Sequence, residues 1–179
     1  MRYYHTTFKQ RVIWEFTYIT RFTTFTYQTT MDYHYTIKHF DELTTHELYA
    51  LLRLRAEVFV VEQNCPYLDP DNKDQQSHHL LYYAGDKLAA YTRLLPAGLS
   101  FDEVSIGRVI TSPAHRGRGL GKKLIEVSIE GCYKLFGRKP IRIGAQLYLL
   151  KFYQSFGFIQ QGDVYDEDGI PHVEMVKAV

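Results

Sequence analysis

One stretch decides the fold of this chain: Val109-Ile-Thr-Ser-Pro-Ala-His-Arg-Gly-Arg-Gly-Leu-Gly-Lys-Lys-Leu124. Its pattern predicts a strand, a short turn and the start of a helix. Gly117, Gly119 and Gly121 leave the turn without side chains that would block a ligand. The backbone N–H groups of such a turn can point into one concavity, and a helix start adds a positive dipole end. The stretch is therefore a candidate phosphate-binding loop.

Four basic side chains add positive charge to this loop, namely Arg116, Arg118, Lys122 and Lys123. The loop has neither the Walker spacing G-x-x-x-x-G-K-[ST] nor the dinucleotide spacing G-x-G-x-x-G. The alternative is a plain helix start with capping glycines and a solvated basic face. The density of glycines directly after a strand favours the phosphate-binding interpretation.

Outward from this stretch, the sequence predicts the order β-α-β-β-β-α-β-α-β-β within one mixed α/β (α+β) domain. Strands are expected at residues 31–40, 78–83, 87–95, 103–111, 141–145, 158–164 and 172–177. Helices are expected at residues 43–61, 119–136 and 147–156. The polar segment 66–77 between the first helix and the second strand is expected to be a loop.

Two arginines fall where charges are costly. Arg55 lies on the apolar stripe of the first predicted helix, and Arg108 lies inside a buried strand. Such a charge needs a partner or a ligand. Together with Glu62, these arginines are candidates for binding a substrate, and an internal Arg–Glu pair is the equally favoured alternative.

The loop and a second segment resemble a known family. Arg116-x-x-Gly119-x-Gly121 resembles the R/Q-x-x-G-x-G/A acetyl-CoA loop of the GNAT N-acetyltransferases. Gln146, followed seven residues later by Tyr153 and then by Gly157-Phe158, resembles that family's N-x₆-Y-x₃-G-F segment, with Gln in place of the usual Asn. The resemblance spans residues 31–179.

Several longer stretches resemble the ElaA branch of that family: 55–67, 106–108, 144–146, 152–158 and 167–172. The family resemblance implies a mostly antiparallel central sheet with helices on both faces and a central β-loop-α motif. It also implies transfer of an acetyl group from acetyl-CoA, as co-substrate, to an amine on a small molecule or peptide. The amine would attack directly in a ternary complex.

The resemblance assigns roles residue by residue. The expected acetyl-CoA contacts are Val109, Ile110, Thr111, Arg116, Gly117, Arg118, Gly119, Leu120, Gly121, Lys122 and Gln146. Tyr153 would protonate the leaving thiolate, because a phenol with a pKa of about 10 keeps its proton at neutral pH. The base that deprotonates the amine is either Glu103, acting through water, or Glu62.

Three histidines on predicted strands are further candidates for the base: His78, His79 and His172. The ordinary interpretation of each is a packed polar residue.

Two other functions remain open. The run Arg55-x-x-Val58-Phe59 also resembles the start of acyl-homoserine-lactone synthases, which share the fold but lack the complete glycine loop. A domain that binds CoA without catalysis is the second alternative. Tyr153 and the unblocked loop argue against it.

Composition excludes several classes of protein. A net charge of +1 gives no bulk electrostatic basis for binding nucleic acid or an anionic membrane. Cys65 and Cys132 cannot form a disulfide framework, and they suit a reducing cytoplasm. No metal is expected, since no His/Cys/Asp cluster has metal-ligand spacing. A monomer or homodimer with a small-molecule or peptide amine as substrate is expected.

Residues 1–30 differ from the rest of the chain. They contain nine Thr and nine aromatic residues but no Gly, Pro, Ala or Leu. High strand propensity without turn residues is more typical of an aggregation-prone segment than of a domain. We interpret residues 1–30 as a non-native or disordered extension and Met31 as the true start of a single domain, 31–179. The alternative is an additional strand or arm that packs on the domain.

Overall fold

A seven-stranded sheet in the order β1-β2-β3-β4-β5-β7-β6 forms the centre of the described residues. The computed structural model describes residues 32–179, so the hypotheses about residues 1–30 and the start at Met31 lie outside the described residues. The strands are β1 Tyr33–His39, β2 His78–Ala84, β3 Lys87–Leu95, β4 Val104–Thr111, β5 Ile141–Gln146, β6 Phe158–Glu167 and β7 Ile170–Lys177. The helices are α1 Thr45–Arg55, α2 Leu120–Phe136 and α3 Leu150–Gln154.

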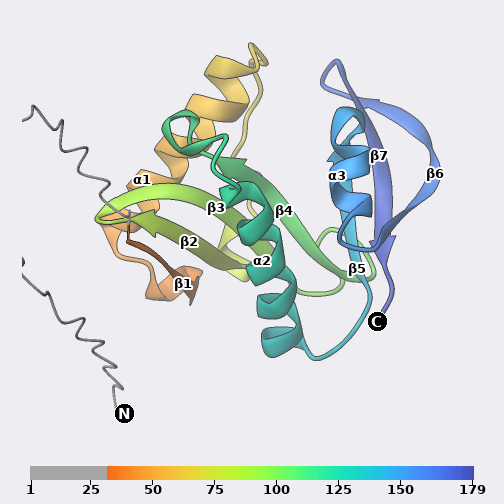
Figure 1. Cartoon of the computed structure of the whole chain (residues 1–179), viewed down its shortest axis with the longest axis horizontal. Coiled ribbons are helices and arrows are strands. Elements are labelled where there is room, and N and C mark those ends of the chain that lie inside the picture. Colours follow the sequence, from red (N-terminus) through yellow and green to blue (C-terminus); the bar gives the residue numbers. More distant parts are fainter. Residues whose placement is uncertain (1–31) are drawn as a thin grey trace, which may run out of the picture. The chain divides into compact units, whose positions relative to one another are not determined.

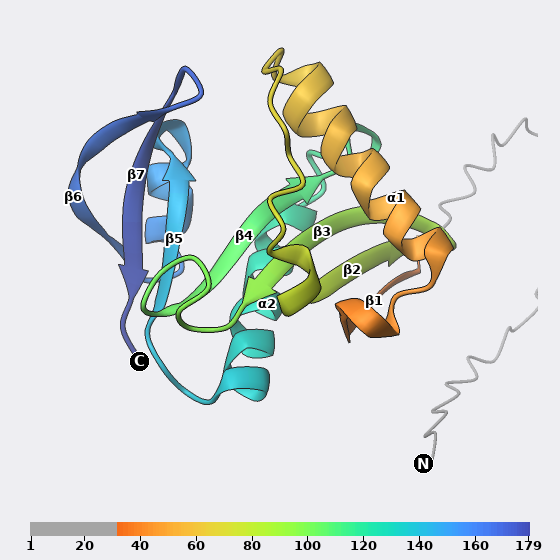
Figure 2. The same cartoon turned by 180° about the vertical axis from the view of Figure 1, so that it is seen from behind.

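The sheet is mixed and mostly antiparallel, which confirms the expected fold class. Among the described strands, β4 and β5 pair in parallel and all other neighbours pair antiparallel. Helix α1 covers one face, whereas α2 and α3 cover the other (Figures 1 and 2). Within residues 32–179, no helix is long and apolar enough to cross a membrane.

Side chains that alternate in direction along the strands explain how helices cover both faces of the sheet. Leu81 and Tyr91 pack with the buried residues of α1, whereas Leu80 and Tyr82 pack with Leu124 on α2. Successive strand side chains point to opposite faces, so apolar residues at adjacent positions supply two separate cores.

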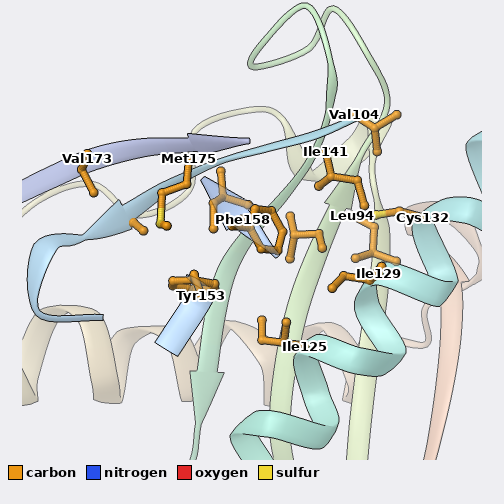
Figure 3. Close-up of a cluster of buried hydrophobic side chains, with 13 residues drawn as sticks. Leu94, Val104, Ile125, Ile129, Cys132, Ile141, Tyr153, Phe158, Val173 and Met175 are labelled. Carbon is orange, nitrogen blue, oxygen red and sulfur yellow. The ribbon is translucent and has the colours of Figure 1, made fainter. Parts of the chain in front are cut away.

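A third cluster joins α2 and α3 to the strands β3–β7. It includes Ile125, Ile129 and Cys132 on one side of α2, and Tyr153 on α3 (Figure 3). Full burial of such apolar side chains stabilises the fold by about 1.5–3 kcal/mol each. This packing fixes α3, and therefore Tyr153, against β5 and β7.

The first helix ends earlier than the sequence predicted. A capping box between Thr44 and Glu47 starts α1 at Thr45, two residues after the predicted start at 43. After Arg55 the chain winds into a π-helical segment, Ala56–Glu62, in which the N–H of Gln63 bonds to the carbonyl of Val58 at 3.2 Å. The wider turn leaves Val58 in the core and presents residues 59 and 62 to the cavity described below.

The sheet opens between β4 and β5. Among the described residues these strands pair at two positions, Val104 with Ile141 and Ser105 with Arg142. Beyond them β4 carries a bulge, because its register with β3 shifts between Tyr91 and Arg93. Arg108 lies in this bulge with a φ of 51°, a conformation that is strained for a non-glycine residue. The two strands diverge from the paired end (Figure 2).

Candidate active site

A cavity of about 920 Å³ lies at the divergence of β4 and β5. Its walls come from β4, the π-helical segment, the start of α2, α3 and the strands β5–β7. Ten of the eleven predicted cofactor residues line it: Val109, Ile110, Thr111, Arg116, Gly117, Gly119, Leu120, Gly121, Lys122 and Gln146. The remaining one, Arg118, is exposed outside the lining.

The glycine loop presents a row of unused N–H groups. From Gly117 to Gly121, no backbone or side-chain acceptor among residues 32–179 receives a hydrogen bond from these amides. Gly117 and Gly119 adopt φ values of 75° and 76°. Glycine reaches this left-handed region at little cost in free energy because it has no Cβ, so these two residues allow the loop to turn. Free amides at the start of the 17-residue helix α2 form a site suited to an anion.

The side chain of Arg116 is already engaged. Its Nε donates to the carbonyl of Thr111 at 3.1 Å, and Nη1 and Nη2 donate to the two carboxylate oxygens of Glu62 at 2.6 and 2.9 Å. The expected contact of this guanidinium with the pyrophosphate therefore needs revision, because Glu62 neutralises its charge. The amides of the loop have no such partner among the described residues, and Lys122 is a cationic neighbour in the cavity lining.

Tyr153 is buried at 5% exposure, yet it lines the cavity. Its hydroxyl makes no hydrogen bond to any other residue in the range 32–179. Burial, with a smaller contribution from Tyr148, raises the pKa of Tyr153 above its ordinary value. The hydroxyl is therefore protonated at neutral pH and available as a donor.

The structure argues against both predicted bases. Glu103 precedes β4, lies outside the cavity lining and holds Arg142 with contacts of 2.7 and 2.8 Å. Glu62 lines the cavity, but its carboxylate is bound by Arg116. These hydrogen bonds lower the pKa of each carboxylate, and a lower pKa makes a weaker base.

Arg55 does not reach the cavity, which corrects its expected role in binding the acceptor. Its side chain is 0% exposed, with Nε 2.7 Å from Asp69 and Nη1 2.8 Å from Asp74. The internal ion pair was the alternative interpretation, but the partners are aspartates rather than a glutamate. Both aspartates belong to the segment 66–77, whose composition predicts only an ordinary polar loop.

Arg108 does line the cavity, as expected of a group that contacts the acceptor. Its Nε lies 2.8 Å from Asp69, and its side chain is 22% exposed. Arg93 donates to Asp71 and to Asp74 at 2.6 and 2.8 Å. Three arginines and three aspartates thus form one network that connects the segment 66–77 to α1, β3 and β4.

The three candidate histidines lie in different environments, and one of them lines the cavity. His79 is fully buried between the hydroxyl of Tyr91 and the carbonyl of Asp74, and His78 packs against Phe136 outside the cavity lining. His172 lines the cavity, and its Nδ1 lies 2.8 Å from the carbonyl oxygen of Ile170.

Residues that are distant in sequence meet in the wall of the cavity. Gln63, at the end of the π-helical segment, approaches Gln146 on β5 at 3.4 Å. The thiol of Cys65 lies 3.6 Å from the carbonyl of Asp168 in the β6–β7 turn. Sequence reasoning did not assign roles to Gln63 or Asp168, because nothing local indicates that they meet their partners.

Sequence comparison agrees with this geometry. The family model described as an acetyltransferase (GNAT) domain matches residues 51–179. The chain therefore belongs to the GNAT acetyltransferase family. Within that family it is a homologue of ElaA: it is 48% identical to the Escherichia coli (strain K12) protein over 143 residues, which are 79% of this chain and 94% of ElaA.

Solved structures share the fold. An acyl-CoA N-acyltransferase from Pseudomonas aeruginosa superposes with a TM-score of 0.78 at 43% identity, over 82% of this chain and 100% of the other. Escherichia coli ElaA gives a TM-score of 0.77 at 45% identity, over 82% and 99% of the two chains. A Bacillus subtilis acetyltransferase solved in complex with CoA shares the fold, with a TM-score of 0.56 at 23% identity over 83% and 99%.

Proposed function

We propose that this protein transfers an acetyl group from acetyl-CoA to an amine by direct attack within a ternary complex. One observation supports this most strongly: the same cavity is lined by the amides of Gly117, Gly119, Leu120 and Gly121 and by the hydroxyl of Tyr153, none of which has an acceptor among the described residues. The amides would bind a diphosphate, and the hydroxyl would donate a proton to the leaving group. Membership of the GNAT family agrees with both roles.

The cavity fits the parts of acetyl-CoA. The amides from Gly117 to Gly121 and the dipole of α2 suit the pyrophosphate. Beyond Ser105, the edge of β4 that faces β5 has no strand partner among the described residues, so Val109 to Thr111 can pair with the extended pantetheine arm. Acetyl-CoA supplies the activated acetyl group when bound.

Tyr153 would act on the leaving sulfur. A thiol has a pKa of about 8.5 and a tyrosine phenol one of about 10, so complete proton transfer from the phenol to a free thiolate is uphill. Burial, which raises the pKa of Tyr153 further, increases this difference. The hydroxyl would therefore donate while the C–S bond breaks, when negative charge develops next to a donor that has no other partner among residues 32–179.

The acceptor would approach from the end of the cavity formed by Phe59 and Arg108, whose guanidinium carbon lies 6.0 Å from the phenyl centroid. We propose a small-molecule or peptide amine as acceptor and a monomer or homodimer as the working state. Neither nucleic acid nor membrane is part of this proposal. The two buried free thiols, Cys65 and Cys132, suit a cytoplasmic location.

Two measurements test the proposal. Isothermal titration of the full chain with acetyl-CoA should show one site per chain. Release of CoA thiol should then accelerate with amines from a panel of polyamines, amino acid amides and short peptides. Failure to bind acetyl-CoA would overturn the proposal, whereas binding without acetylation of any amine would favour a non-catalytic CoA-binding domain.

A further inference from the structure

We propose that His172 is the general base that removes the proton from the acceptor amine. This inference rests on the proposed acetyl transfer, which needs a base on the acceptor side. Glu62 is bound by Arg116, and Glu103 lies outside the cavity lining. His172 lines the cavity and, in the described part of the chain, has one hydrogen bond, at Nδ1.

That hydrogen bond determines which ring nitrogen can accept a proton. Nδ1 of His172 lies 2.8 Å from the backbone oxygen of Ile170, and a carbonyl oxygen can only accept. Nδ1 must therefore hold the hydrogen, and in the neutral ring Nε2 presents its lone pair. A backbone carbonyl two residues away thus selects the tautomer that a base requires.

The position of His172 in the sheet places it opposite the proposed acid. Ala145 on β5 and Val173 on β7 are buried in the cluster that contains Tyr153. Gln146 and His172, each one position away, therefore point to the other face, where Gln146 meets Gln63, the residue directly after the π-helical segment. Acid and base would approach the reacting carbon from opposite sides.

The neighbours of His172 hold its ring in place. Tyr165 is its register partner on β6, and the two rings stack with centroids 5.9 Å apart. Burial, together with Glu167, raises the pKa of Tyr165 to about 12, so this neighbour is neutral at physiological pH. The charged groups nearby are Glu174 on the same face of β7, held by Arg142 at 2.8 Å, and Glu167 and Asp168 in the cavity lining.

The proton balance of the reaction is complete with these two side chains. The amine nitrogen bonds to the acetyl carbon, and its proton passes to Nε2 of His172. The C–S bond breaks with its electron pair on sulfur, which takes the hydroxyl proton of Tyr153. One proton then returns from the imidazolium to the phenolate through water, giving the amide, the free thiol and the original enzyme.

His172→Asn is the decisive variant, because its amide can still donate to the carbonyl of Ile170 while no nitrogen replaces Nε2. The probes are acetyl-CoA with alanylalanine amide and with Nα-acetyl-lysine amide. We expect kcat/KM to fall about 10²–10⁴-fold. Acetyl-CoA affinity should not change. His46→Asn, on the exposed side of α1, is the matched control.

Near wild-type turnover in His172→Asn would overturn the inference, since it would show that the ring is structural. Nitrogen-15 NMR of the wild-type chain gives an independent result: Nδ1 should bear the hydrogen, and a dominant Nε2–H tautomer would also overturn it. A wild-type chain that binds acetyl-CoA but acetylates neither probe would instead contradict the proposed transfer to these amines, and the assignment of a base would fail with it.

Discussion

The guanidinium of Arg116 binds both carboxylate oxygens of Glu62, 54 residues earlier in the chain, at 2.6 and 2.9 Å. The pair connects the glycine loop to the π-helical segment, so two separate parts of the cavity wall share a direct contact. Its side chains are 43% and 41% exposed, and pairs of this kind contribute about 0–1 kcal/mol to stability. Its effect should therefore be seen in binding rather than in folding.

We expect Glu62→Gln to bind acetyl-CoA about two- to fivefold more tightly at low salt, the equivalent of up to about 1 kcal/mol. Without the carboxylate, the charge of Arg116 becomes available to the phosphates. Isothermal titration at two salt concentrations measures this, with Glu57→Gln in the same π-helical segment as the control. Turnover that slows by about two orders of magnitude or more in Glu62→Gln would instead restore Glu62 as the base.

Gly119→Glu should abolish acetyl-CoA binding while the domain remains folded. A Cβ at Gly119 meets nothing within 4 Å, so the folding cost is the strain of a φ of 76°, about 1–2 kcal/mol. The carboxylate would then oppose the phosphates. Gly137→Glu is a matched control, because Gly137 has a φ of 80°, equally open space and a position outside the cavity lining. Equal binding by both variants would remove the loop from the site.

Tyr153→Phe should slow turnover about 10²–10⁴-fold with little change in melting temperature. The ring stays packed, and the missing hydroxyl leaves no described partner unsatisfied. Tyr91→Phe provides the contrast, because the Tyr91 hydroxyl lies 2.8 Å from His79 in the core. Its loss should destabilise the fold by about 1–3 kcal/mol without altering turnover per folded molecule. If Tyr153→Phe instead loses stability by about 1 kcal/mol and keeps its turnover, the hydroxyl is structural.

The arginine–aspartate network should make the protein sensitive to acid. Burial alone would raise the pKa of Asp74, but hydrogen bonds from Arg55 and Arg93 outweigh it and lower that pKa. Because the unfolded chain has an aspartate pKa of about 3.9, Asp74 binds fewer protons when folded. Its stabilisation is complete well above this unfolded-state pKa and declines as the pH falls below it.

Urea unfolding at a series of pH values from neutral to acid measures this dependence. Asp74→Asn should flatten the fall in unfolding free energy toward the acid end, and Asp86→Asn, in the exposed turn between β2 and β3, should not. An unchanged slope in Asp74→Asn would show that other carboxylates control the acid sensitivity.

Local patterns were sufficient to predict the order of strands and helices. Thr44 and Gly137 set the ends of helices through capping geometry that depends on near neighbours. The transition to a π-helix after Arg55 was missed, because the apolar spacing there also fits an α-helix. The turn between β6 and β7 consists of only Asp168 and Gly169. Strand β6 therefore continues to Glu167 and β7 begins at Ile170, beyond the predicted limits of 164 and 172.

Sequence predicted the parts of the site that lie within one continuous segment. It did not predict the contacts between segments that are distant along the chain. The glycine loop is contiguous, so its position at the cavity followed from sequence. Arg142 meets Glu103 across 39 residues, and Arg55 meets Asp74 across 19, because the sheet brings their strands and loops together. The roles of the individual residues in catalysis stay predictions.

The short junction between β4 and β5 has a mechanical consequence. The strands β1–β4 and β5–β7 form two ladders that share two paired positions, Val104 with Ile141 and Ser105 with Arg142. Bending there disturbs fewer backbone hydrogen bonds than bending within either ladder. A bend at this junction would change the width of the cavity mouth while both ladders keep their backbone hydrogen bonds.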